Sequence, residues 1–353
     1  MLFNLSGKGN YPYACARAKA KKSLLLTKDN YPKLLMMDLS EIGRFLGETQ
    51  YQAEITELAS RYSGVNLIEL GTSRNLARTY SDILGFCTGD LRDMIEAYLC
   101  RWDFWNLKTI LRGKYYGASA EEIQEDLVPA GKLSAEHLNS LIALEGNTEV
   151  LEAIRRKEGL CIPDEVMTAF EESGALDPIE DFLDKIYYAR LLERIRPTNK
   201  PKKLFVSFVK KEIDVTNLRT LLKLKRADTP LGRMCDLFID GGEELNLRTL
   251  SRLAGLEDFR QMADELSNFK FFESISEGLE EAKNGESLSE VMFELQKYLV
   301  RQSERFSHIY PLSVLPVLDF LLRKKIEVDN IRIIARGKES RMDLDVIKNL
   351  LVV

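Results

Sequence analysis

The chain has 353 residues, 45% hydrophobic and 30% charged, which is enough for two or three domains with apolar cores. Its formal net charge of −5 argues against bulk electrostatic binding to nucleic acid or anionic lipid, but does not exclude a local basic face. Its five cysteines are dispersed without a CxxC pair, as in buried thiols of a reducing cytoplasm and unlike a disulfide framework or a zinc site.

Helical patterns follow one another along nearly the whole chain. Asp38 opens a helix that runs to Leu46, residues 90–116 form one long periodic segment that stops at Gly117, and Ser119 and Ser134 cap the next two helices. Strand patterning is confined to short runs such as 203–206, so the sequence predicts an all-α protein. Further helices are expected at 163–172, 178–194, 206–224, 245–253 and 257–266, and the strongest turn signals at 159–163, 196–201 and 283–287.

No stretch reaches the roughly 20 consecutive apolar residues of a membrane span. The first residues also lack the apolar core of a signal peptide. We therefore expect a cytoplasmic protein, with any membrane association made through a partner.

One helical phrase recurs at a nearly constant period. Its copies read WDFWNLKTILRGK, IDVTNLRTLLKLK and EVDNIRIIARGK, and their anchor residues Asn106, Asn217 and Asn330 are 111 and 113 residues apart. In each copy an aliphatic residue and a cation follow the Asn, and a second cation comes four positions after the first. A constant period of this kind indicates repeated structural units.

The paired cations define a basic stripe on each repeated helix, because residues four apart lie on one helix face. A weaker fourth copy, YACARAKAKK, keeps the spacing but has Cys15 in place of the Asn. Two interpretations stand side by side: the stripes line a central cavity and bind a partner, or they pair with acids such as Asp103 and Asp214 inside each unit. The cations concerned are Arg17, Lys21, Lys108, Arg112, Arg219, Lys223, Arg332 and Arg336.

A second repeated pattern suggests how the units close. Residues 127–144 correspond to 237–255, each a turn followed by a helix, whereas the third copy ends at residues 350–353 where that element is due. The N-terminal segment 24–46 has a loop and helix of the required kind. We therefore predict three similar helical domains, at 67–160, at 161–279, and at 280–353 together with 1–66.

Signals for catalysis are weak. The two histidines, His137 and His308, have no spacing typical of metal ligands or a catalytic triad. The chain has no GxxxxGK[ST] loop, and Gly7-Lys8-Gly9 is too short to hold a phosphate. We therefore expect no catalytic residue, no cofactor and no metal.

Three motifs, in their order along the chain, give a resemblance that covers nearly its full length. They are Tyr-x-Tyr-x-x-Ala-Arg near the start, Asp-x-x-Asn-Leu-Lys in the middle and Asp-Asn-Ile-Arg near the end. The chain thus resembles the C subunit of archaeal and bacterial A-type/V-type rotary ATPases, the counterpart of the d subunit in eukaryotic vacuolar ATPases. It departs at Cys15, where members often have Asn. The matching residues are Tyr11, Tyr13, Ala16, Arg17, Asp103, Asn106, Leu107, Lys108, Asp329, Asn330, Ile331 and Arg332.

The resemblance implies a non-catalytic, funnel-shaped protein of three domains in pseudo-threefold arrangement. In that family the protein is peripheral on the cytoplasmic side of the membrane. It joins the central-stalk shaft to the ring of proteolipid subunits during ion-coupled ATP synthesis or hydrolysis. Nucleotides and transported ions are bound by other subunits.

Two alternatives come from other classes. A helical-repeat protein that binds nucleic acid or serves as a scaffold would use the basic stripes, although the overall acidity and the long period suit nucleic acid badly. An enzyme would need a pocket of converging polar groups, which the sequence does not show.

Overall fold

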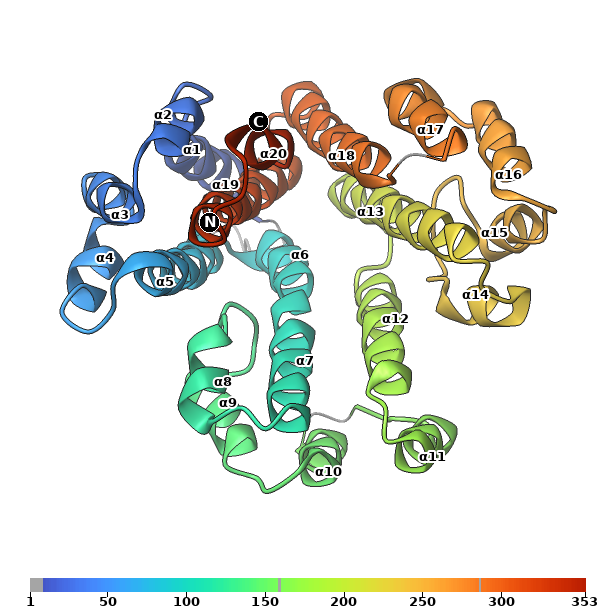
Figure 1. Ribbon diagram of the computed structural model, residues 1–353, viewed down its shortest axis with the longest axis horizontal. Helices are drawn as coiled ribbons and strands as arrows, with labels where there is room; N and C mark the ends of the chain where they lie inside the picture. Colours follow the sequence, from blue (N-terminus) through green and yellow to red (C-terminus); the bar gives the residue numbers. More distant parts are fainter. Residues whose placement is uncertain (1–8, 158–159, 286) are drawn as a thin grey trace, which may run out of the picture. The chain divides into compact units, whose positions relative to one another are not determined.

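The computed structural model describes residues 9–157, 160–285 and 287–353 (Figure 1). These residues form helices and contain no strand, so the all-α prediction is confirmed. The turn signals at 159–163 and 283–287, and Gly7-Lys8-Gly9, lie partly outside the described residues.

The chain forms two compact units. One comprises residues up to Leu183 with Phe320–Leu351 and Val353, and the other comprises Asp184–Asp319 and Val352, so that α12 (Asp177–Arg194) and α19 (Leu315–Glu339) contribute to both. The first unit also contains α1 Tyr11–Lys22, α2 Asn30–Met36, α3 Leu39–Gly47, α4 Gln52–Leu58, α5 Gly64–Phe86, α6 Gly89–Leu99, α7 Arg101–Tyr115, α8 Ala120–Asp126, α9 Ala135–Ile142, α10 Asn147–Lys157, α11 Asp164–Ser173 and α20 Leu344–Asn349. The second also contains α13 Lys200–Arg226, α14 Leu231–Leu237, α15 Leu247–Ala254, α16 Phe259–Glu265, the short 3-10 helices η1 Leu266–Asn268 and η2 Phe272–Ser274, α17 Ser276–Lys283 and α18 Ser289–Ile309.

Helix starts follow the capping residues closely. The Asp38 carboxylate accepts a hydrogen bond from the Glu41 N–H, and the Glu41 carboxylate accepts one from the Asp38 N–H, a capping box that begins α3. Ser119 begins α8 in the same way, and Ser134 caps α9. These predicted starts are confirmed.

One sequence expectation was wrong in detail. Residues 90–116 do not form one helix, because the helix is interrupted at Cys100, between the end of α6 and the start of α7. The short strand-like run 203–206 lies inside α13, which begins at Lys200 after the capping Asn199. In this helix Pro201 occupies the first turn, where its missing N–H costs nothing.

The anchor asparagines bind a loop that comes 22 residues later. The Asn106 side chain donates to the Val128 carbonyl and accepts from the Val128 N–H, both at 2.8 Å. Asn217 makes the same two bonds to Ile239, also at 2.8 Å. Both asparagines are buried. Since a side-chain amide has both a donor and an acceptor, it satisfies both polar groups of a buried backbone position at once.

An aspartate three positions before each of these asparagines fixes the rest of the loop. Asp103 accepts hydrogen bonds from the N–H groups of Lys132 and Leu133, both at 2.9 Å. Asp214 accepts three in its own loop, from Glu243, Glu244 and Leu245, at 2.9 to 3.1 Å.

Glycine makes room for these carboxylates. A Cβ atom at Gly131 would lie 2.1 Å from Asp103 Oδ1, and one at Gly242 would lie 2.3 Å from Asp214 Oδ1. No side chain fits in so small a gap, so the loop sequence and the helix sequence constrain each other.

A lysine eight positions after each Asn holds the end of a second helix. Lys114 Nζ donates to the carbonyls of Ile142 and Leu144 at the end of α9, and Lys225 Nζ donates to those of Ala254 and Leu256 at the end of α15. The last carbonyls of a helix have no hydrogen-bond partner within the helix. A cation at this end also interacts favourably with the negative end of the helix dipole.

In the third copy the N-terminal segment contributes the partner groups. Lys338 Nζ donates to the Leu35 carbonyl of α2, 2.7 Å away. The acid three positions before Asn330 is Glu327, which accepts from the Leu26 N–H. Thus Lys338 of α19 binds a carbonyl near the end of α2, as Lys114 of α7 binds one at the end of α9.

A buried ion pair adds to this junction between the two ends of the chain. Lys324 Nζ lies 2.9 Å from Glu327 Oε1 and 2.8 Å from the Tyr51 hydroxyl, and the Lys324 and Glu327 side chains are 0% and 2% exposed. Tyr51 and Gln50 both donate to the same carboxylate, at 2.5 and 2.9 Å. Burial lowers the pKa of Lys324, and the Glu327 charge opposes that shift. The three-domain division and the pseudo-threefold arrangement stay predictions.

We expect Asn217→Ala to destabilise the protein by about 3 kcal/mol, because it leaves the buried N–H and carbonyl of Ile239 without partners. Asn246→Ala is the matched control, since Asn246 only caps the exposed start of α15 and its loss costs about 1 kcal/mol. Thermal unfolding of the two variants measures the difference. Equal shifts in the melting temperature would contradict the anchoring role.

We expect Lys324→Met to cost about 3–5 kcal/mol, because it leaves the Glu327 carboxylate buried without its countercharge. The neighbouring Lys325→Met removes a partly exposed pair with Asp329 on the same helix and should cost less than about 1 kcal/mol. Urea unfolding monitored by circular dichroism compares the two. The ion pair is unimportant to the junction if Lys324→Met is as stable as Lys325→Met.

Candidate functional site

The basic stripe is the candidate site, and its second cation forms ion pairs in two of the three Asn-anchored copies. Arg112 of α7 binds Glu180 of α12 through two parallel hydrogen bonds, each 2.5 Å long. Arg336 of α19 binds Glu69 of α5 in the same two-pronged way. The bond to Glu69 raises the pKa of the Arg336 guanidinium. A long helix with a glutamate therefore lies beside each of these repeated helices.

In the three Asn-anchored copies the first cation is less exposed than the second. Arg219 of α13 is half-buried and donates to the Met292 carbonyl and the Gln296 side chain of α18, at 3.2 and 3.4 Å. Arg332 of α19 donates to the Ser73 hydroxyl of α5. Burial lowers the pKa of Arg219. Both guanidinium groups thus connect the repeated helix to the long helix beside it.

The remaining cations differ from one another. Lys21 forms an ion pair with Asp82 at 2.9 Å, and Arg17 lies against the rings of Tyr13 and Phe86. Lys108 is half-buried. Within the described part of the chain, Lys223 is exposed and its side chain has neither an ion-pair nor a hydrogen-bond partner.

The acids Asp103 and Asp214 accept hydrogen bonds from loop backbone. Acids on flanking helices pair with three of the stripe cations: Asp82 with Lys21, Glu180 with Arg112 and Glu69 with Arg336. Charge pattern along one helix could not indicate partners on another.

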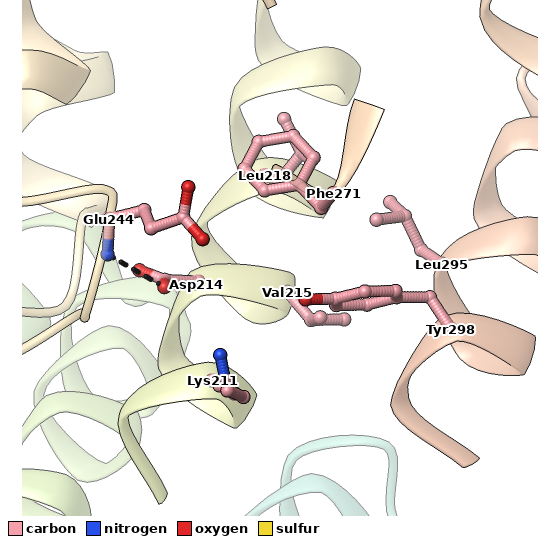
Figure 2. A pocket seen from close by; sticks show the side chains of 8 residues that line it. All are labelled: Lys211, Asp214, Val215, Leu218, Glu244, Phe271, Leu295 and Tyr298. Carbon is pink, nitrogen blue, oxygen red and sulfur yellow. Dashed lines mark hydrogen bonds between the residues drawn. The ribbon is translucent and has the colours of Figure 1, made fainter. Parts of the chain in front are cut away.

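A small hollow opens between α13 and α18 (Figure 2). Figure 2 shows Asp214 bonded to the backbone of Glu244, with Tyr298 across the hollow from α18. Burial raises the pKa of Asp214, although three backbone N–H groups act in the opposite direction. Its carboxylate is already used by the loop, so the hollow is part of the repeat packing.

The other sequence candidates for chemistry belong to different units. His137 lies in the first turn of α9 in the first unit, and His308 lies in the last turn of α18 in the second, where its ring contacts the Glu304 carbonyl. No cluster of three or more His, Cys, Asp or Glu residues suited to a metal occurs within 9–157, 160–285 and 287–353. Among the same residues no helix is long and apolar enough to cross a membrane.

The fold and the stripe define the class of the protein. It is an all-helical repeat protein whose recurring polar residues hold its own loops and helices together. Sequence reasoning missed the lysines at the eighth position, Lys114, Lys225 and Lys338, although they recur with the same period as the asparagines. Their alignment with the anchors was the signal that would have identified them.

Comparison with known proteins identifies the family. Residues 14–350 match the model of the ATP synthase (C/AC39) subunit family, and the chain belongs to that family. It is 39% identical over 346 residues to the A-type ATP synthase C subunit of Methanococcoides burtonii, covering 98% of this chain and 94% of the relative. The C subunits of Methanosarcina acetivorans and Haloferax volcanii are 40% and 35% identical; the matches cover 98% and 99% of this chain, and 94% and 99% of the relatives. The family resemblance noted from the sequence is confirmed.

The two kinds of stripe cation are expected to respond differently to charge reversal. Arg219→Glu should cost about 2–3 kcal/mol, because it places a carboxylate against the Met292 carbonyl. Lys223→Glu, one turn further along the same helix face, should change stability by less than about 0.5 kcal/mol. Melting temperatures of the two variants test this. If both melt like the parent protein, Arg219 is not a structural residue.

Proposed function

We propose that this protein is a non-catalytic central-stalk component of a rotary A-type ATP synthase, joining the rotor shaft to the membrane ring of proteolipid subunits. The observation that supports it most directly is the similarity, along nearly the full length, to proteins named as the C subunit of A-type ATP synthases. The proposal places the protein on the cytoplasmic side of the membrane, held there by its partner subunits.

The internal packing suits a part that transmits torque. Such a part must resist twisting, and a helix bound to distant loops through several directed hydrogen bonds deforms less than one held by apolar contacts alone. Asn217, Asp214 and Lys225 attach one face of α13 to its loop and to α15. The same three residue types, Asn106, Asp103 and Lys114, do this for α7.

The basic stripe is proposed as the surface that binds the shaft, and its cations have different roles. Six of them hold neighbouring groups within their own unit, so a partner would meet them as a pre-arranged surface. Exposed Lys223 is the member whose charge is free to act on an incoming acidic or carbonyl-rich segment. The six are Arg17, Lys21, Arg112, Arg219, Arg332 and Arg336.

Reconstitution of the complex in liposomes tests the proposal. Without this chain, the nucleotide-binding head should still hydrolyse ATP while ATP-driven ion pumping is lost, and the added chain should restore pumping. Lys223→Glu should require at least about tenfold more protein for the same recovery, since like charges across an interface are costly. Full pumping without the chain would refute the function. Normal recovery with Lys223→Glu would remove only the stripe from the interface.

A further inference from the structure

The second unit has a locally basic corner on an otherwise acidic chain. Residues 190–203 contain six Lys or Arg and one acid, and residues 297–312 contain three Lys or Arg and one acid. The whole chain has a formal net charge of −5. The two segments are far apart in sequence, so their meeting in space is a property of the fold.

Antiparallel packing of α13 and α18 brings these segments together (Figure 1). At one end of the pair, Arg219 contacts Met292. Further along, Lys211 Nζ lies 5.8 Å from the centre of the Phe306 ring, and at the far end Lys200 Nζ lies 5.5 Å from that of Tyr310.

Five cations at this corner are exposed, and their side chains form no ion pair or hydrogen bond with any residue that the structure describes. They are Arg196, Lys200, Lys203, Arg301 and Arg305. This separates them from the stripe cations, six of which hold neighbouring groups. Exposed charge without an internal ion-pair partner adds little to the stability of the fold.

Two large aliphatic side chains protrude beside these cations. Ile309 is 52% exposed and Leu312 is 64% exposed, on either side of Tyr310. Arg301, Arg305 and Ile309 succeed one another at four-residue intervals, so they share one face of α18. The corner thus ends in the exposed aliphatic residues Ile309 and Leu312, and Arg305 and Arg301 lie one and two turns before Ile309 on the same face of α18.

We propose that this corner, made of Arg196, Lys200, Lys203, Arg301, Arg305, Ile309 and Leu312, binds the anionic headgroup surface of a lipid bilayer. Aliphatic side chains enter the boundary between headgroups and acyl chains, and Arg and Lys reach lipid phosphates over their long apolar stems. A nucleic acid would use the cations but leave Ile309 and Leu312 in water. The inference goes beyond the proposed function, in which the partners are protein subunits.

Co-sedimentation of the full-length protein with phospholipid vesicles tests the inference. We expect binding to vesicles with roughly 30% phosphatidylglycerol and little binding to pure phosphatidylcholine, with a loss at high salt. Each basic residue at an anionic surface is worth roughly a fivefold change in partitioning, so Arg301→Glu with Arg305→Glu should weaken binding at least about 25-fold. Ile309→Ser with Leu312→Ser should weaken binding without changing its salt dependence.

The matched control is Arg248→Glu with Arg260→Glu, two exposed cations of the same unit outside the corner. This control should bind like the parent protein, and circular dichroism should show all variants folded. Equal binding to neutral vesicles, or equal loss in the control, would overturn the inference. So would a parent protein that ignores vesicles while the Arg301/Arg305 variant fails to join the reconstituted complex, because the corner would then be a protein interface. The proposed function is tested separately, by comparing pumping of the complex with and without the parent chain, and none of these three results decides that comparison.

Discussion

The packing of both units depends on a buried asparagine that satisfies both polar groups of one backbone position. A loop that leaves a helix and returns to it must bury peptide groups, and each one left unpaired costs about 1–3 kcal/mol. Asn106 pairs with the N–H and carbonyl of Val128, and Asn217 pairs with those of Ile239 at the same distances. Three further residues depend on the loop position fixed in this way. They are the aspartate before each Asn, the glycine that faces this aspartate, and the lysine that binds the carbonyls at the end of the next helix.

The sequence was sufficient for the class and family, because these rest on caps, short motifs and spacings that can be recognised without knowing which helices are neighbours. Capping residues such as Asp38 and Ser119 placed helix starts, and the spacing of the asparagines indicated the repeat. The break at Cys100 was missed because apolar periodicity continues through it.

The contacts made by the candidate site could not be predicted from the sequence. That Arg112 is held by Glu180 and Arg336 by Glu69 depends on which helices lie side by side, and charge along one helix does not contain that information. The same limit hid the basic corner, whose two halves lie in distant parts of the sequence. Cations alike in sequence therefore differ in physical role, some fixed by a carboxylate or carbonyl and others exposed to solvent.

The hydrogen bonds between the N-terminal segment and α19 have a consequence for biosynthesis. The Leu26 N–H and the Leu35 carbonyl find their partners 301 and 303 residues later, on Glu327 and Lys338. At a synthesis rate of about 5–20 residues per second, the segment waits roughly 15–60 seconds on the ribosome before those groups exist. During that interval α2 presents to solvent an apolar face that the finished protein buries. The newly made chain is therefore open to chaperones, and to misassociation with its neighbours on a polysome, at α2.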